Sequence, residues 1–405
     1  MISSYLFEHP LTERYRYKST VPVNVAIIGA GEGSAAALDG TLQNAQTPSA
    51  AKLDHYAPPV ACSVFWPIAF AKQYVEERPE LTNFFALEWR YDGLEMSSTP
   101  PRPRRSLGTI TFTNRYDLVT RRDCLDKCLK KDLHFAFVSL NDDANYELAA
   151  SVAEARPSAV VHVARRPGAP TFRDERIGIY DPNATSRWET LIDEMARRID
   201  RVWMAINSAS DPDRFDEDVS KPVNRYFYKS SRTLACALTD ILNSFSLGLS
   251  LFDESTRAAA ARVLTRRLTD DPYARGRLAL SMHYRWIARM ICDGWRPYSD
   301  VSQIFKLGVK CVTYKQHAGI AAARMESPLL EETGLNYFLH EASESDLNQL
   351  DELDWINVQI LRHNLRVGND SPPRIFKRNG YAIALNIPFI LTGTGLKTGD
   401  ELHFS

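Results

Sequence analysis

Three glycines and a serine, spaced as in phosphate-binding turns, are the residues of this 405-residue chain best suited to chemistry. Gly29, Gly31 and Gly33 follow the apolar run 23–28, and Ser34 stands where the G-x-G-x-x-G fingerprint has its third glycine. A strand that passes through such a turn into a helix leaves backbone N–H groups at the positive end of the helix dipole, where a phosphate can bind. The spacing favours a nucleotide site, and an ordinary glycine turn is the alternative.

A second group of polar residues follows a later apolar run, residues 134–140. Asp142, Asp143 and Asn145 are suited to cap a helix and to contact the ribose hydroxyls of a nucleotide. Acid–base chemistry is the alternative for the two aspartates. Because the carboxyl ends of parallel strands share one edge of a sheet, we expect these residues to lie near the glycine turn.

An acidic residue that binds ribose often stands at the end of a later strand in such domains. Glu88 is the candidate, because residues 81–90 are predicted to form a strand and Glu88 lies near its end. Its distance from the glycine turn far exceeds the usual spacing of about 20 residues. Selectivity for an NAD-type ligand therefore stays open.

Signatures of an enzyme are missing from the sequence. It contains no G-x-S-x-G, H-E-x-x-H or Walker motif, and no carboxylate pair framed by histidines. Its six cysteines show no C-x-x-C and no zinc-type spacing with histidine. We therefore predict no catalytic residue, no metal site and no disulfide.

Composition and charge narrow the class of partner. Basic residues number 49 and acidic residues 50, so the chain has no overall field that would attract nucleic acid or an anionic membrane. The sequence has no apolar run of about 18 residues and no signal-peptide pattern. We therefore expect a cytoplasmic protein that binds no nucleic acid and does not insert into a membrane.

The elements that must position these residues alternate between strand and helix patterns. Strands are predicted at 23–28, 60–65, 81–90, 109–113, 134–140 and 159–164, and helices at 33–44, 68–77, 121–131 and 146–155. Such alternation predicts an α/β domain with a mainly parallel, Rossmann-like sheet, followed by a mostly α-helical region. The predicted divisions are an N-terminal arm (1–22), the Rossmann-like domain (23–183), a connecting helix and linker (184–222) and a helical domain (223–405).

The helical region carries its own aromatic and basic group. His283 and Trp286 share a face of a predicted helix that Gly294 ends, and Trp295 and Arg296 follow directly. Indole faces stack on a nucleobase, and arginine pairs with phosphate or carboxylate, so a ligand site is one interpretation. A general-base role for His283 is a second interpretation. The remaining alternative is that the tryptophans and the histidine pack in the core and the arginine makes a surface ion pair.

The glycine turn and residues 134–166 resemble the nucleotide-binding domain that regulates potassium uptake systems and channels (TrkA-N, or RCK-like). In that family a hydrophobic strand ends in a D-D-x-N-like turn, and the strand after the next helix ends in a basic residue, here Arg165. The resemblance implies NAD or another adenine nucleotide as ligand, a homodimer, and a separately encoded membrane transport subunit as partner. Residues 44–106 exceed the family's usual length.

Residues 278–298 resemble the repeat domain first described in ryanodine receptors (RyR domain), which occurs in bacterial proteins fused to such nucleotide-binding domains. Met282 replaces the glutamate of that family, and residues 363–381 form an apparent insertion. The resemblance implies a second ligand site, made by His283, Trp286, Trp295, Arg296 and His317.

Together these features predict a regulatory protein that senses a nucleotide, with potassium transport or a bacterial stress or defence response as its setting. An NAD(P)-dependent oxidoreductase or an NAD-consuming enzyme is the second hypothesis. A scaffold that binds no nucleotide is the third.

Overall fold

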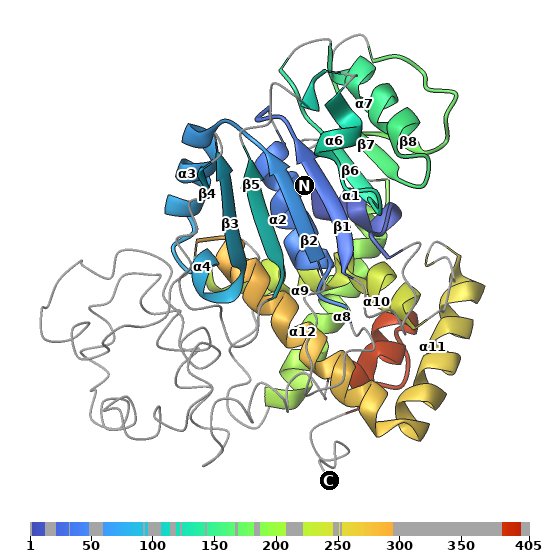
Figure 1. The fold of residues 1–405 in the computed structure, drawn as a ribbon. Helices are drawn as coiled ribbons and strands as arrows, with labels where there is room; N and C mark the ends of the chain where they lie inside the picture. Colours follow the sequence, from blue (N-terminus) through green and yellow to red (C-terminus); the bar gives the residue numbers. More distant parts are fainter. Residues whose placement is uncertain are drawn as a thin grey trace, which may run out of the picture. The chain divides into compact units, whose positions relative to one another are not determined.

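The chain forms two compact units in the computed structural model, and each is described by itself (Figure 1). Unit 1 comprises Met1–Ile192 with Cys236–Thr256, and unit 2 comprises Asp193–Ala235 with Arg257–Ser405. The structure describes residues 2–12, 22–31, 33–47, 60–91, 94–95, 107–113, 119–121, 124–141, 144–166, 169–181, 187–207, 222–245, 251, 253–294 and 383–397.

Unit 1 is built on an eight-stranded sheet with the order β4-β3-β5-β2-β1-β6-β7-β8. Its strands are β1 Val23–Ile28, β2 Val60–Phe65, β3 Ala86–Tyr91, β4 Leu94–Glu95, β5 Thr109–Thr113, β6 Phe135–Val138, β7 Val160–Ala164 and β8 Ile177–Tyr180. All neighbours are parallel except β3 and the two-residue β4. The predicted Rossmann-like α/β class is confirmed.

Helices cover both faces of this sheet. They are α1 Ile2–Glu8, α2 Ser34–Asn44, α3 Ile68–Glu76, α4 Leu81–Phe84, α6 Leu125–Cys128 and α7 Ala144–Ala155. Alternate residues of β1 face opposite ways, and Ala26 and Ile28 join a core that includes Ala149 and Val152 of α7. On the other face His162 of β7 contacts Tyr5 of α1. The core is therefore split by the sheet into two apolar layers.

The described residues after β8 are mostly helical, as predicted. Their helices are α8 Glu189–Asn207, α9 Pro222–Cys236, α10 Leu238–Ser244, α11 Glu254–Asp270 and α12 Pro272–Cys292, and residues 383–392 are also helical. Gly294 has φ 78° and follows the end of α12, as its predicted role requires. No helix within the described residues is long and apolar enough to cross a membrane.

Several predicted elements were wrong. Residues 81–90 hold the short helix α4 before β3 begins at Ala86, and β8 was not predicted. The helix expected at 121–131 is reduced to Leu125–Cys128. The guanidinium of Arg156 donates to the carbonyl oxygens of Leu129 at 2.7 Å and Lys130 at 2.8 Å. These carbonyl groups are therefore engaged outside a helix, which accounts for the early end of α6.

Candidate functional site

The strand order places a topological switch point between β1 and β6. The chain leaves β1 for β2 on one side and later enters β6 on the other. Open parallel sheets bind ligands outside the carboxyl ends of their strands at such a point. The glycine turn follows β1 and residues 139–141 follow β6, so the two predicted segments meet there. We call this place the β1–β6 crevice.

Backbone geometry at the glycine turn explains two of its glycines. Gly29 has φ 92° and Gly33 has φ 87°, conformations that other residues rarely adopt. Gly31 has a different reason, because a Cβ there would lie 2.4 Å from the carbonyl oxygen of Ser139. Its N–H donates to that same oxygen at 2.8 Å. Gly31 thus joins the ends of β1 and β6, and its N–H is engaged within the protein.

Ser34 fills the position of the third glycine and is fully buried. Its hydroxyl donates to the carbonyl oxygen of Gly29 and accepts a hydrogen bond of 2.7 Å from Nε1 of Trp66. This side chain therefore packs α2 against the strand ends.

The start of α2 is uncapped. Gly33 supplies no side-chain cap, and the first-turn N–H groups of Ala35 and Ala36 have no acceptor among the described residues. These groups are placed to receive an anion.

The end of β2 carries an indole where NAD-selective sheets carry a carboxylate. Trp66 follows Phe65, and both are buried. Beyond them Ile68, which is 40% exposed, opens α3. This rim of the crevice is apolar.

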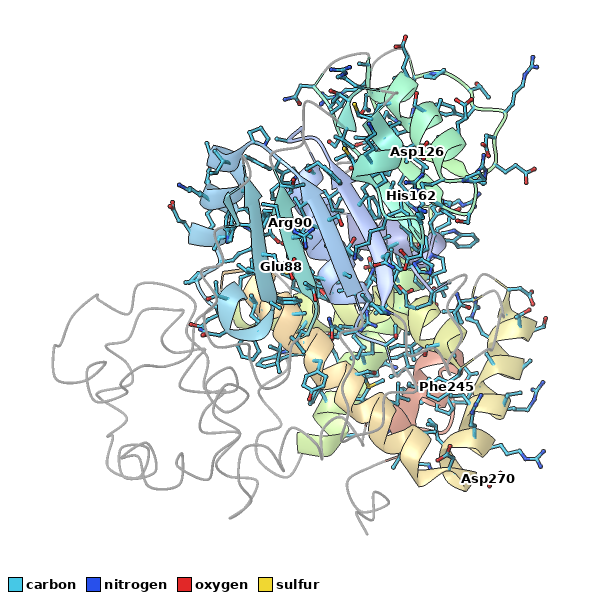
Figure 2. All side chains as sticks on the ribbon, in the orientation of Figure 1. Glu88, Arg90, Asp126, His162, Phe245 and Asp270 are labelled. Carbon is cyan, nitrogen blue, oxygen red and sulfur yellow. The ribbon has the colours of Figure 1, made fainter. Side chains whose placement is uncertain are left out.

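Glu88 does not lie at a strand end, and its expected position was wrong. It is in the middle of β3, where its carboxylate accepts from the Thr111 hydroxyl at 3.2 Å and pairs with Arg90 at 3.1 Å (Figure 2). Strands β5 and β2 separate β3 from β1. Three strand spacings amount to about 14 Å, so Glu88 is too far from the crevice for ribose contact.

On the other side of the crevice, Asn145 holds strand ends together. It is fully buried, its Oδ1 accepts from the N–H of Leu140 at 2.8 Å, and its Nδ2 donates to the carbonyl oxygen of Ala164 at 2.8 Å. Both groups are engaged by backbone, so Asn145 supports the crevice and is not placed for ligand contact. Asp142 and Asp143 lie outside the described residues.

The basic residue that reaches this region is Arg166, which the sequence reasoning missed. Arg165 is exposed, and its N–H donates to the carbonyl oxygen of Tyr180 at 2.7 Å. The guanidinium of Arg166 instead binds Oδ1 of Asn141 at 2.8 Å, beside the glycine turn. Two consecutive arginines after a strand were the available signal, but their order alone could not show which of them turns toward β6.

Little of the predicted site in unit 2 falls within the described structure. His283 and Trp286 lie on α12, as predicted, and Trp286 is half-buried. The side chain of His283 and all of Trp295, Arg296 and His317 lie outside the described residues. Whether these residues share a ligand stays a prediction.

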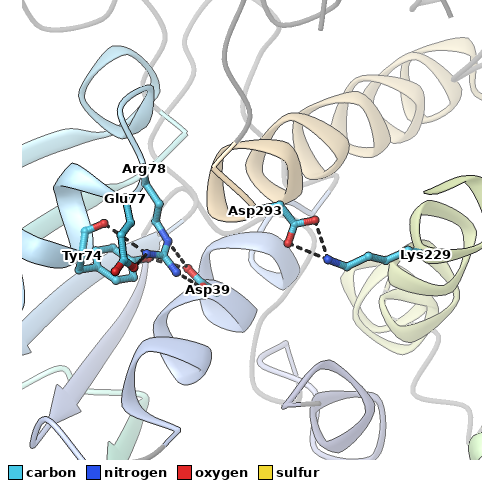
Figure 3. Close-up of polar contacts among 6 residues, drawn as sticks. All are labelled: Asp39, Tyr74, Glu77, Arg78, Lys229 and Asp293. Atoms are coloured by element: carbon cyan, nitrogen blue, oxygen red, sulfur yellow. Dashed lines mark hydrogen bonds and ion pairs between the residues drawn. The ribbon is translucent and has the colours of Figure 1, made fainter. Parts of the chain in front are cut away.

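Ion pairs fix the end of α12. Asp293 pairs with Arg289 at 3.2 Å and with Lys229 of α9 at 2.9 Å, as Figure 3 shows for the lysine. These contacts tie α9 to α12 and serve packing within unit 2.

The described parts of the chain offer no group of three metal-ligating side chains placed to hold an ion. Burial raises the pKa of Cys62 on β2 to about 12, which leaves a neutral thiol within the sheet. Comparison with known proteins found no match to a family model, a curated protein or a solved structure.

Proposed function

We propose that this chain is a regulatory protein that binds a nucleotide in the β1–β6 crevice. The observation that carries the proposal is the uncapped start of α2, placed by the glycine turn at the switch point of a parallel sheet. Occupancy would shift the balance between two conformations, because a ligand favours whichever conformation binds it more tightly.

An adenine nucleotide such as NAD is the ligand class we propose, on the resemblance of residues 134–166 to the potassium-regulator family. Trp66 is buried at the end of β2, and Glu88 lies on a strand far from the crevice. Both observations argue against recognition of the ribose hydroxyls by a carboxylate. The phosphates would then provide most of the recognition. We accordingly expect NAD and NADP to bind with similar affinity.

The setting of this function is proposed from resemblance. A homodimer acting on a separately encoded membrane transport subunit in a bacterial cytoplasm is one form. A bacterial stress or defence response, with a second ligand read by the RyR-like region, is another.

Calorimetry with NAD, NADH, NADP, ATP, ADP, AMP and ADP-ribose tests the proposal. Ala35 is part-exposed in the first turn of α2, so Ala35→Glu places a negative charge among the N–H groups that would hold a phosphate. We expect at least tenfold weaker binding than in Ala35→Gln, the neutral control of nearly equal size. The helix dipole favours a carboxylate at this position, so the glutamate variant should fold at least as stably.

Each other result selects another function. Equal binding by both variants would show that the nucleotide does not bind at the start of α2. Loss of NAD during incubation, or reduction of NAD with a hydride donor, would favour the enzyme hypothesis. Failure of the wild-type protein to bind any nucleotide would leave the scaffold hypothesis as the remaining one.

A Gly31→Asp variant is a poor probe, because its Cβ would collide with the Ser139 carbonyl oxygen and disturb the fold itself.

A further inference from the structure

The backbone of Arg166 is fixed by one side chain. Its N–H donates to the hydroxyl of Tyr146 at 2.6 Å, and the same hydroxyl donates to its carbonyl oxygen at 3.0 Å. Tyr146 itself is buried against the core of α7 and the sheet. Arg166 therefore leaves β7 in one defined direction.

The guanidinium of Arg166 lies across the end of β6. Its Nε and Nη2 donate to the carbonyl oxygen of Leu140 at 3.1 Å and 2.7 Å, and Nη2 also donates to Oδ1 of Asn141 at 2.8 Å. That Oδ1 would lie 2.9 Å from a Cβ placed on Gly31. The cation is therefore held one side chain away from the glycine turn.

Only neutral oxygen atoms hold this cation in the described structure. Elsewhere in unit 1 arginines pair with carboxylates: Arg78 with Asp39, Arg90 with Glu88, Arg156 with Asp126, Arg176 with Asp174, and Arg187 with Glu8. Among the described residues no carboxylate pairs with Arg166, and none of them accepts a hydrogen bond from its Nη1. A half-buried guanidinium whose Nη1 is available attracts an anion more strongly than a fully solvated guanidinium does.

We propose that Arg166 binds a phosphate group of the ligand through Nη1 and is the residue that selects phosphorylated ligands. This inference rests on the proposed nucleotide function and names the residue that carries it. Nε and Nη2 keep the guanidinium in place while Nη1 meets the phosphate, so little side-chain freedom is lost on binding. Arg165, the basic residue implied by family resemblance, has no part in this contact.

Calorimetry on the full chain tests the assignment with AMP, ADP, NAD and ADP-ribose, and with adenosine as the ligand that lacks phosphate. Because the variant loses a charge-assisted hydrogen bond to the phosphate, we expect Arg166→Gln to bind the phosphorylated ligands at least tenfold more weakly. Arg165→Gln is the matched control and should stay within twofold of wild type. Adenosine should bind wild type and Arg166→Gln equally, because it presents no phosphate.

Arg166→Lys guards against a folding defect, since it keeps the positive charge and an aliphatic stem. We expect an intermediate affinity for AMP, because an ammonium group cannot hold Leu140 and the phosphate together. Unchanged affinity for AMP in Arg166→Gln, or a larger loss in Arg165→Gln, would overturn the assignment and leave the proposed function standing. A wild-type chain that binds none of the nucleotides would overturn the proposed function as well.

Discussion

His162 is a neutral histidine enclosed by the sheet and α1 (Figure 2). Only 1% of it is exposed, its Nδ1 lies 2.7 Å from the Tyr5 hydroxyl, and its Nε2 has no partner in the part of the chain that the structure describes. Burial, with a smaller contribution from His9, lowers its pKa to about 3.

Because of His162, we expect the free energy of unfolding to decrease in mild acid. With an unfolded pKa of 6.5 and a folded pKa of about 3, the unfolded chain binds more protons between these values. Its contribution is complete above pH 6.5 and decreases as pH falls, by up to about 1.4 kcal/mol per pH unit. His162→Gln keeps a polar partner for Tyr5 and cannot titrate. Urea denaturation at pH 7.5 and pH 5 should therefore show about 2 kcal/mol less loss in the variant. Equal losses in the two proteins would refute the role of His162.

Single residues also mark where sequence reasoning succeeded and where it failed. It placed Gly29 correctly after β1 and Ser34 correctly at the start of α2, because local chain geometry decides such turns. It could not assign Asn145 to the ends of β6 and β7, since both acceptor and donor lie on other segments. Choosing Arg166 over Arg165 likewise needed the position of the β6 end.

Among the elements, α2 and α3 are joined by an arginine clamp (Figure 3). Arg78 pairs with both carboxylate oxygens of Asp39, at 3.1 Å and 2.9 Å, and its guanidinium carbon lies 3.9 Å from the ring centroid of Tyr74. The Tyr74 hydroxyl donates to Asp39 at 2.7 Å. This clamp holds the helix of the glycine turn against the helix that follows β2.

A double-mutant cycle should show that the clamp stabilises unit 1. For Arg78→Gln and Asp39→Asn we expect a coupling energy of about 1–2 kcal/mol in urea denaturation, because the pair is bidentate and mostly shielded from water. The control pair, Arg90 and Glu88, is 61% and 43% exposed, and its coupling should stay below about 1 kcal/mol. Similar coupling in both pairs would contradict a special role for the clamp.

Periodic elements were predictable where local pattern and tertiary position agree. The runs that became β1, β2 and β5 matched their predicted ranges, because continuous or alternating apolar residues specify a buried strand. The four-residue β8 has little pattern of its own. A Cβ on Gly178 would lie 2.6 Å from the Tyr5 hydroxyl, a contact that only the folded unit reveals.

At the scale of the whole molecule, unit 1 is assembled from segments far apart in the chain. Cys236–Thr256 belongs to it although residues 193–235 belong to unit 2. Asp240 of α10 is fully buried and accepts from the N–H of Thr12 at 2.9 Å and from its hydroxyl at 2.8 Å. A separation of 228 residues left no local signal for this contact.

Asp240 should therefore control whether the N-terminal segment stays on the sheet. In Asp240→Ala the Thr12 N–H loses its carboxylate acceptor, while the Thr12 hydroxyl keeps the backbone carbonyl oxygen of residue 240 at 3.2 Å. We therefore expect the free energy of unfolding to fall by about 1.5–3 kcal/mol. Ser244→Ala in the same helix is the control, since among the described residues that hydroxyl bonds only to the carbonyl oxygen of Ile241 in its own helix. It should change the free energy of unfolding by less than about 1.5 kcal/mol, roughly one hydrogen bond.

Hydrogen exchange locates the change that Asp240→Ala causes. Residues 2–12 should lose protection while β1 keeps its own, because the strand is paired on both sides and Asp240 of α10 binds Thr12 at the end of the segment. Release of α1 would also admit water to His162, so its pKa should rise toward 6.5 and the acid sensitivity of the variant should shrink. Retained protection across 2–12, with acid sensitivity unchanged, would show that other contacts hold the segment.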